Sequence, residues 1–370
     1  MNEKNIGKRI ILATFIIVIC LSWLLWILLA KFVDTENYEN RVLATKPELT
    51  VDSYKTYPSE YEKYFNDNMP FRNNLVTMNA AIDYFIFGKS TNERVVKGKD
   101  DWLFYADRGD GDPISCYQGT NFLSEEELET MAQNCLAVQA YLDGLGKEFV
   151  IFIAPNKERI YYDKMPEKYG TPAYTYKALQ VVEYLRNNTN IRVVYPYDEL
   201  MQAREFLKEN IYYKTDTHWN WIGGYVGAAA LMSELGVEVP DIASNEITIL
   251  SGGNTSGDLA GMLNLNKYLA YADYEYTVEG YDTHNVETIE SDVGTVFSYH
   301  AEGADPRKIY ISRDSFSTAM SQYIGSQFAN TYMRHRNTYT YEDFAEQNPD
   351  IFVYETVERY VDGLASFSIQ

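Results

Sequence analysis

The stretch TDTHWNWIGG, residues 215–224, contains the side chains of this 370-residue chain that are best suited to proton transfer. Asp216 and His218 lie two residues apart, and the chain has only four histidines. An imidazole beside a carboxylate can act as a general base, because the carboxylate fixes the tautomer and stabilises the protonated ring. The same pair could bind a metal ion or form a polar turn that caps the following helix. The residue types alone leave these three uses open.

A candidate nucleophile, Ser315, lies further along the chain. The segment RKIYISRDSFSTAM, residues 307–320, predicts an apolar strand, a sharp turn at Ser315 and a helix. Such a turn exposes a serine hydroxyl, and the helix N-terminus supplies backbone N–H groups for an oxyanion. Ser and Asp are also ordinary helix N-caps, so the turn alone does not separate catalysis from capping.

Among the histidines, only His218 has a carboxylate two residues away at the start of a predicted helix. His284 follows Asp282 but falls in a predicted β segment, and the arginines on both sides of His335 lower its basicity. Neither His284 nor His300 adds the ligand spacing of a zinc or dimetal hydrolase. We therefore expect His218 to serve Ser315 as a base, and we expect no metal site.

Alternating helix and strand patterns must hold these residues in place. Ser124 and Glu127 form a capping box that begins a helix, and the apolar run EFVIFIA after that helix is typical of a buried strand. This alternation continues and predicts an α/β fold with a parallel sheet flanked by helices. Residues 264–300 show a period of two and are predicted to be a small β insertion. The expected helices end near residues 144, 187, 208 and 235, and the expected strands lie at 148–154, 191–196, near 308 and at 351–355.

Residues 10–30 form an uncharged apolar run, which as a helix of ~1.5 Å per residue is long enough to span a hydrocarbon core of ~30 Å. A cleaved signal peptide has a shorter apolar core of roughly 7 to 15 residues, so we expect an uncleaved anchor. Lys4, Lys8 and Arg9 precede the run and place residues 1–9 in the cytoplasm. The expected organisation is a transmembrane helix at 10–30, a linker at 31–56 and an extracellular or periplasmic domain at 57–370.

Composition narrows the class of partner. Hydrophobic residues make up 46% of the chain and the formal net charge is −21, which is typical of a folded acidic protein and argues against a nucleic-acid partner. Cys116 and Cys135 lie beyond the predicted anchor, where they could form a disulfide. Cys135 also falls on an apolar helical stripe, so a buried free thiol is an equal alternative.

Several motifs, taken in chain order, resemble the DHHW family of bacterial envelope proteins and the related alginate O-acetyltransferases, whose domain is a permuted SGNH hydrolase. The similar segments cover most of the chain beyond the predicted anchor. They are ENRVL (39–43), YFNDNMPFR (64–72), DDWLFY (100–105), APNKERIYYDKMP (154–166), DTHWN (216–220), RDSF (313–316) and PDIFVYETVER (349–359).

The resemblance implies a role for each member of a triad. It assigns Ser315 as the nucleophile, His218 as the base and Asp216 as the residue that orients the base. Asp and His precede Ser in this chain, which requires the permuted arrangement, and Arg313 stands where the G-D-S motif of SGNH hydrolases has glycine.

Three further residues are candidates for oxyanion or substrate binding. They are Asn254 in SGGNTSGDL, Arg313, and Trp219, which with Trp221 and tyrosines could line a cleft that favours a sugar hydroxyl over water.

The resemblance implies a membrane-anchored serine O-acetyltransferase that modifies hydroxyl groups of a cell-surface polysaccharide through an acyl-enzyme on Ser315. It also implies a partner, a membrane-bound O-acyltransferase that delivers the acetyl group across the bilayer, and it requires no dissociable cofactor. Two alternatives stay open. One is a carbohydrate O-acetylesterase with the same triad, and the other is a non-catalytic scaffold that binds polysaccharide or organises export.

Overall fold

The computed structural model describes residues 3–29, 42–69, 71–244 and 246–369. The chain divides into two compact units, Met1–Asn92 with Gly261–Asn266, and Glu93–Ala260 with Lys267–Gln370. Part of the predicted linker, residues 31–41, lies outside the described residues, as do residues 1–2 of the predicted cytoplasmic segment.

The first unit consists mainly of helices. They are α1 (Glu3–Leu29), α2 (Tyr57–Asp67), α3 (Arg72–Ala81) and a π-helical turn, η2 (Ile82–Ile86). The helices α2 and α3 lie on either side of residue 70. Within the residues that the structure describes, no helix is long and apolar enough to cross a membrane.

The second unit is built on a seven-stranded sheet of order β4-β3-β11-β9-β10-β8-β7. The first five strands are parallel, as the alternation of helices and strands predicts, whereas β8 and β7 are antiparallel to their neighbours. The sheet is thus mixed and not purely parallel, because a turn of three residues joins β7 to β8, and so short a connection allows only an antiparallel pair. The bounds are β3 (Glu148–Ala154), β4 (Arg192–Val194), β7 (Val286–Asp292), β8 (Val296–Ala301), β9 (Asp305–Arg313), β10 (Phe328–His335) and β11 (Ile351–Val357).

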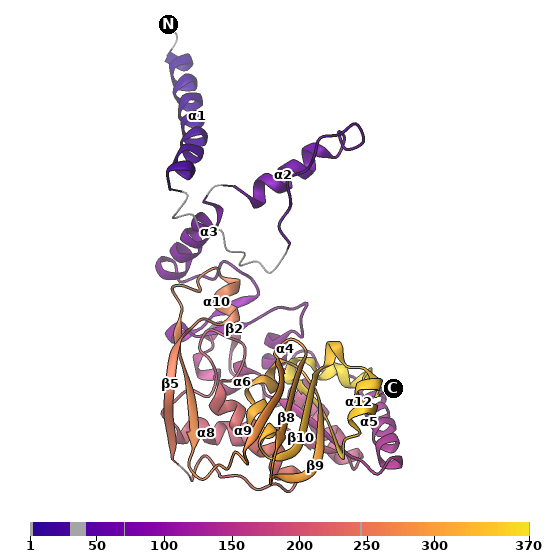
Figure 1. Cartoon of the computed structure of the whole chain (residues 1–370). Coiled ribbons are helices and arrows are strands. Elements are labelled where there is room, and N and C mark those ends of the chain that lie inside the picture. The colour runs from indigo at the N-terminus through magenta and orange to yellow at the C-terminus, as the bar shows by residue number, and fades with distance from the viewer. Residues whose placement is uncertain (1–2, 30–41, 70, 245, 370) are drawn as a thin grey trace. The chain divides into compact units, whose positions relative to one another are not determined.

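Both faces of the sheet are covered by helices, which explains the continuous apolar strands. Successive side chains of β3 point to opposite faces, so Val150 and Phe152 join the core beside α9 (Trp221–Glu234). Ile151 and Ile153 join a second core beside α5 (Glu125–Gly144) and α7 (Lys177–Asn188). In Figure 1, α9 and α5 lie on opposite sides of strands β8, β10 and β9. The predicted capping box of Ser124 and Glu127 is present at the start of α5.

The predicted β insertion at 264–300 does not form a separate element. Its first strand, β6 (Tyr271–Val278), pairs with β5 (Ile247–Thr255), a strand that the sequence analysis did not predict. Its remaining strands, β7 and β8, extend the main sheet, and β7 is the outermost strand, with a bulge between Thr288 and Glu290.

The remaining elements are short. Two strands, β1 (Val95–Lys97) and β2 (Leu103–Tyr105), form an antiparallel hairpin. The other helices are α4 (Pro113–Gln118), α6 (Lys157–Ile160), α8 (Tyr197–Phe206), α10 (Asp258–Met262), α11 (Ser321–Gly325) and α12 (Tyr341–Gln347). Cys116 and Cys135 are both buried free thiols, and burial raises the pKa of Cys116 to about 11 and that of Cys135 to about 12.

Candidate active site

Ser315 lies at the carboxyl end of the parallel strands, the edge at which α/β sheets bind their ligands. It begins a 3-10 turn, η6 (Ser315–Ala319), directly after β9. Asp314 caps this turn, because its carboxylate accepts from the backbone N–H of Phe316 at 2.8 Å and of Val357 in β11 at 2.7 Å. Asp314 is therefore the N-cap of this turn, and the Ser315 hydroxyl can form a hydrogen bond with another residue.

The loop that carries Asp216 and His218 leads into α9. The cap of α9 is Asn220, whose side-chain oxygen accepts from Ile222 N–H at 3.0 Å and Gly223 N–H at 3.1 Å. Asp216 and His218 are thus not needed to cap the helix. Of the three uses that the sequence left open for this pair, the polar capping turn is wrong.

Ser315, His218 and Asp216 form a continuous row of hydrogen bonds. His218 Nε2 lies 2.7 Å from Ser315 Oγ, and His218 Nδ1 lies 2.6 Å from Asp216 Oδ1. An ionised carboxylate only accepts hydrogen bonds, so Nδ1 carries the proton and Nε2 accepts from the serine hydroxyl. This is the tautomer that a base for Ser315 requires.

Electrostatics favour a charged imidazole in this row. Burial acts to lower the pKa of His218, but the hydrogen bond and negative charge of Asp216 outweigh burial and raise the pKa above its usual 6.5. Burial acts to raise the pKa of Asp216, yet its bonds to His218 and to the Asp258 backbone hold that pKa well below its usual range. A pair of this kind accepts a proton from a serine and returns it at modest cost.

A second carboxylate, Asp258, holds the loop from the other side. Its backbone N–H donates to Asp216 Oδ2 at 2.9 Å. Its carboxylate accepts from the backbone N–H of Thr217 at 2.9 Å and from the Thr217 hydroxyl at 2.7 Å. Burial and the charge of Asp216 raise the pKa of Asp258. Both oxygens of Asp216 consequently accept hydrogen bonds, which hold its carboxylate in one orientation.

A metal ion would need the same atoms. Ligand atoms of Asp216, His218 and Asp258 all lie within 4.8 Å of one another. However, His218 Nδ1 is bonded to Asp216, and the oxygens of Asp216 and Asp258 accept from backbone N–H groups and a hydroxyl. These hydrogen bonds use the same oxygen and nitrogen atoms that a cation would need as ligands. The arrangement therefore favours a hydrogen-bonded row over a metal site.

Beneath the turn that begins at Ser315 lies a buried carboxyl group, that of Glu355 in β11, which is 1% exposed. Its Oε2 accepts from the backbone N–H of Asp314 at 2.7 Å and from the Ser317 hydroxyl at 2.8 Å. Burial and the neighbouring Asp314 raise its pKa well above the usual value. The turn is therefore tied to the next strand on both sides of Ser315.

Trp219 does not line an open cleft. It is 1% exposed, and its indole N–H donates to the Phe316 carbonyl at 2.8 Å. Its ring packs against Phe316 with centroids 5.3 Å apart, so it fixes the distance between the His218 loop and the Ser315 turn. The expected substrate contact is thus replaced by a packing contact within the protein.

The structure does not bring Arg313 or Asn254 into the row. The guanidinium of Arg313 is buried, donates to the carbonyls of Val293 at 2.8 Å and Asp314 at 3.2 Å, and lies over Phe297. Arg313 thereby links the end of β9 to the turn between β7 and β8. Asn254 lies in β5 in register with Ala272, with an exposed side chain.

Sequence reasoning missed Asp258, Glu355 and the buried Lys157, described below. Asp258 occurs in SGGNTSGDL, the segment that supplied Asn254, so the sequence pointed to this segment but not to Asp258. Glu355 is the one charged residue in the apolar strand IFVYETV, and a charge inside a buried strand is itself a signal.

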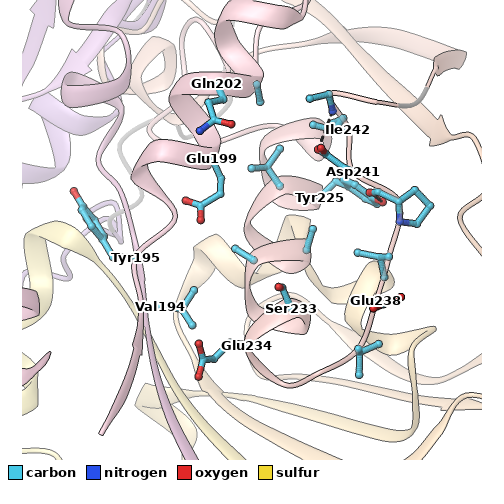
Figure 2. A pocket seen from close by; sticks show the side chains of 18 of the residues that line it. Val194, Tyr195, Glu199, Gln202, Tyr225, Ser233, Glu234, Glu238, Asp241 and Ile242 are labelled. Atoms are coloured by element: carbon cyan, nitrogen blue, oxygen red, sulfur yellow. Dashed lines mark hydrogen bonds between the residues drawn. The ribbon is translucent and has the colours of Figure 1, made fainter. Parts of the chain in front are cut away.

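The second unit also contains cavities that none of the three residues of the row lines. The cavity in Figure 2, about 780 Å³, is lined by β4, α8, α9 and residues 236–243, and none of the three residues of the row lines it. Figure 2 labels Glu199, Glu234, Glu238 and Asp241 among its lining residues. A second cavity of about 560 Å³ is lined by Ser312 of β9, by Tyr354 of β11 and by Arg336 and Arg359, which follow β10 and β11. It is therefore this second cavity that lies at the carboxyl edge of the sheet.

The mixed sheet, its flanking helices and the nucleophile turn define an SGNH hydrolase-like α/β domain. Residues 95–304 match the family described as "SGNH hydrolase-like domain, acetyltransferase AlgX". The match spans more than half of the chain. The chain therefore belongs to this family of O-acetyltransferases. The resemblance that the sequence motifs indicate is confirmed.

Relatives and solved structures agree with this assignment. A protein of Azotobacter vinelandii named "Probable alginate O-acetylase AlgJ" is 25% identical over 331 residues, which covers 81% of this chain and 78% of that protein. Bacillus cereus PatB1 has a similar fold, with a TM-score of 0.53 and 16% identity over 75% of this chain and 100% of PatB1. A DHHW family protein of Eubacterium siraeum has a TM-score of 0.50 and 14% identity, covering 74% of this chain and 97% of that protein.

Proposed function

We propose that this chain is a serine O-acetyltransferase that modifies hydroxyl groups of a polysaccharide outside the membrane through an acyl-enzyme on Ser315. The observation that carries the proposal is the row from Ser315 through His218 to Asp216, with bonds of 2.7 and 2.6 Å. Membership of the acetyltransferase family and the relative named as an alginate O-acetylase support acetyl transfer and a polysaccharide acceptor.

In the first half-reaction, Ser315 Oγ attacks the carbonyl carbon of an acetyl ester while His218 Nε2 takes the serine proton. The bond between that carbon and the donor oxygen breaks, and His218 gives the proton to the departing oxygen. In the second, a sugar hydroxyl gives its proton to His218 and attacks the acetyl-serine. The bond from Ser315 Oγ to the acetyl group breaks, and His218 returns the proton to Ser315.

Charge on the carbonyl oxygen develops near the start of η6. The backbone N–H of Ser315 is the first of this turn, and the cap formed by Asp314 is bonded to Phe316 N–H instead. Buried Arg359 adds positive charge, with its guanidinium carbon 5.5 Å from the Phe316 ring centroid. These groups are suited to stabilise an oxyanion in a partly buried site.

The apolar run at residues 10–30, with basic residues before it, supports a single-pass anchor with the catalytic unit outside the membrane. Acetyl-CoA is a cytoplasmic donor, so an extracytoplasmic transferase needs a membrane-bound O-acyltransferase that passes acetyl across the bilayer. The anchor would keep the two proteins in the same plane. The reaction as written requires no dissociable cofactor.

The test is the intact mass of the protein after incubation with a chromogenic acetyl ester. Wild type is expected to gain one acetyl group, while Ser315→Ala gains none and loses ester turnover by about 10³-fold or more. Thr318→Ala, three residues away in the same turn, is the matched control and retains the adduct, because the buried Thr318 hydroxyl has no hydrogen-bond partner among the described residues. An acetyl adduct that persists in Ser315→Ala, or its absence from folded wild type, would contradict the acyl-enzyme.

A further inference from the structure

Lys157 is a fully buried lysine, 1% exposed, that follows β3 and begins α6. Its ammonium group lies within hydrogen-bonding distance of three backbone carbonyl oxygens, those of Tyr213 at 3.1 Å, Lys214 at 3.4 Å and Asp216 at 2.5 Å. A lysine ammonium has three N–H donors and no acceptor. All three acceptors belong to the loop that carries Asp216 and His218.

Aromatic rings close the other side of this ammonium group. Its nitrogen lies 5.6 Å from the ring centroid of Trp102 and 5.2 Å from that of Phe104, both of them buried. The intervening residue, Leu103, donates its backbone N–H to the Lys214 carbonyl at 3.0 Å. The motifs DDWLFY and APNK, far apart in sequence, thus meet at the loop that precedes His218.

Stability alone is a poor explanation for a charge at this position. Burial lowers the pKa of Lys157 to about 8, and the facing carboxylates of Glu158, Asp216 and Asp258 only partly offset that effect. An apolar side chain of the same length would fill the space without the cost of desolvating a charge. What the apolar side chain lacks is the set of three donors directed at the loop.

We infer that Lys157 is a positioning residue for the proposed reaction, whose ammonium group fixes the backbone of residues 213–216 and thereby the Asp216 carboxylate that orients His218. The inference rests on the proposed function, because it concerns the same row. Asp216 is then held on two sides, its carbonyl by Lys157 and its carboxylate by the backbone of Asp258. A displacement of about 1 Å in such a row can reduce a rate by roughly 10²-fold.

Two neutral variants separate position from charge. Both variants end one heavy atom short of the Lys157 nitrogen, but Lys157→Met has no donor, whereas Lys157→Gln keeps two N–H donors. With a chromogenic acetyl ester, Lys157→Met is expected to lose roughly 10²-fold in kcat with KM unchanged, and Lys157→Gln to recover part of that loss. Lys177→Met is the matched control, because Lys177 is also buried but bonds Asp362, away from the loop. Equal kcat in wild type and Lys157→Met, measured below their unfolding temperatures, overturns the inference.

The pH profile gives a second signature. Lys157 keeps its third donor below a pH of about 8 and loses it as pH rises through that value, so wild-type kcat should fall on the alkaline side. Lys157→Gln has no proton to lose and should not show this fall. An alkaline limb that is identical in wild type and Lys157→Gln contradicts the inference.

A third measurement does not depend on turnover. NMR titration of histidine-labelled protein gives the pKa of His218 in both neutral variants. Both lack the lysine charge, so a lower pKa of His218 in Lys157→Met than in Lys157→Gln reports a weaker bond to Asp216. Equal values overturn the positioning role. If wild type shows no ester turnover, the proposed function fails while this comparison still decides the role of Lys157.

Discussion

A single imidazole in this protein faces two carboxylates with different tasks. Asp216 bonds the His218 ring directly at 2.6 Å, whereas Asp258 reaches it only through the Thr217 hydroxyl, which lies 3.2 Å from His218 Nδ1. Both negative charges raise the pKa of His218 against the effect of burial. The imidazole of His218 is consequently neutral only at pH values above its raised pKa, and the proposed transfer of the Ser315 proton requires this neutral form.

Asp216→Asn should separate the effect of Asp216 on the pKa of His218 from that of Asp258. The substitution removes the carboxylate that fixes the tautomer, and turnover of an acetyl ester is expected to fall by about 10⁴-fold. The pKa of His218 also falls toward 6.5 or below, so the acid limb of the remaining activity moves to lower pH than in wild type. The measurement is kcat/KM as a function of pH.

Asp282→Asn is the control for this prediction, because Asp282 and His284 repeat the D-T-H pattern away from the row. It should leave both rate and acid limb unchanged. An acid limb at the same pH in wild type and Asp216→Asn would show that His218 is not the titrating base.

At the scale of elements, two glycines allow neighbouring segments to pack closely against the residues of the site. Gly257 lies against the loop that carries Asp216 and His218, and Gly224 of α9 lies against the turn that begins at Ser315. A Cβ atom on Gly257 would collide with the backbone of Thr215 and Asp216, and one on Gly224 would collide with the carbonyl of Ala319. The first contact brings Asp258 against the loop, and the second brings α9 against the turn that follows Ser315. Close backbone contacts at these glycines therefore contribute, together with the packing of Trp219 on Phe316, to the distance between His218 and Ser315.

Gly257→Ala is expected to push the loop away from Asp258 and to lower kcat by roughly 10²-fold, with less effect on KM. Gly253→Ala in the same segment is the matched control, because a Cβ atom there meets nothing within 4 Å. Steady-state kinetics with an acetyl ester and thermal unfolding of both variants provide the comparison. Normal kcat in Gly257→Ala would mean that this close approach does not position the row.

Periodicity predicts the elements that lie in the core, and it predicts them well. The strands β3, β9 and β11 and the helices α5, α7, α8 and α9 lie where apolar runs and caps place them. It fails for β5 and β7, whose described side chains are largely exposed and leave no apolar pattern, and it does not show that β8 pairs with β10 in the main sheet. The same reason explains the site. The row of Asp216, His218 and Ser315 follows from motifs, whereas Asp258 and Lys157 act through contacts with backbone atoms, which leave no pattern in the sequence.

At the scale of the whole molecule, two parts of the chain differ in the environment they favour. The charged residues that give the chain a net charge of −21 favour water, whereas the apolar segment at residues 10–30 favours a lipid bilayer. We expect the full chain to remain with the membrane fraction after alkaline carbonate extraction, and a chain that lacks residues 1–30 to be released. A chain that lacks only residues 1–9 is the control and should remain bound, since it keeps the apolar run. Release of the full chain under the same conditions would rule out the anchor.

The outer strand β7 also has a consequence for molecules that share a crowded surface. An exposed sheet edge is a template to which another chain can add a strand. Here that edge carries Glu287, Glu290 and Asp292 on exposed positions, and a bulge interrupts its regular spacing. The charges and the bulge both disfavour the addition of a strand from a neighbouring copy. This edge is therefore protected against intermolecular sheet extension.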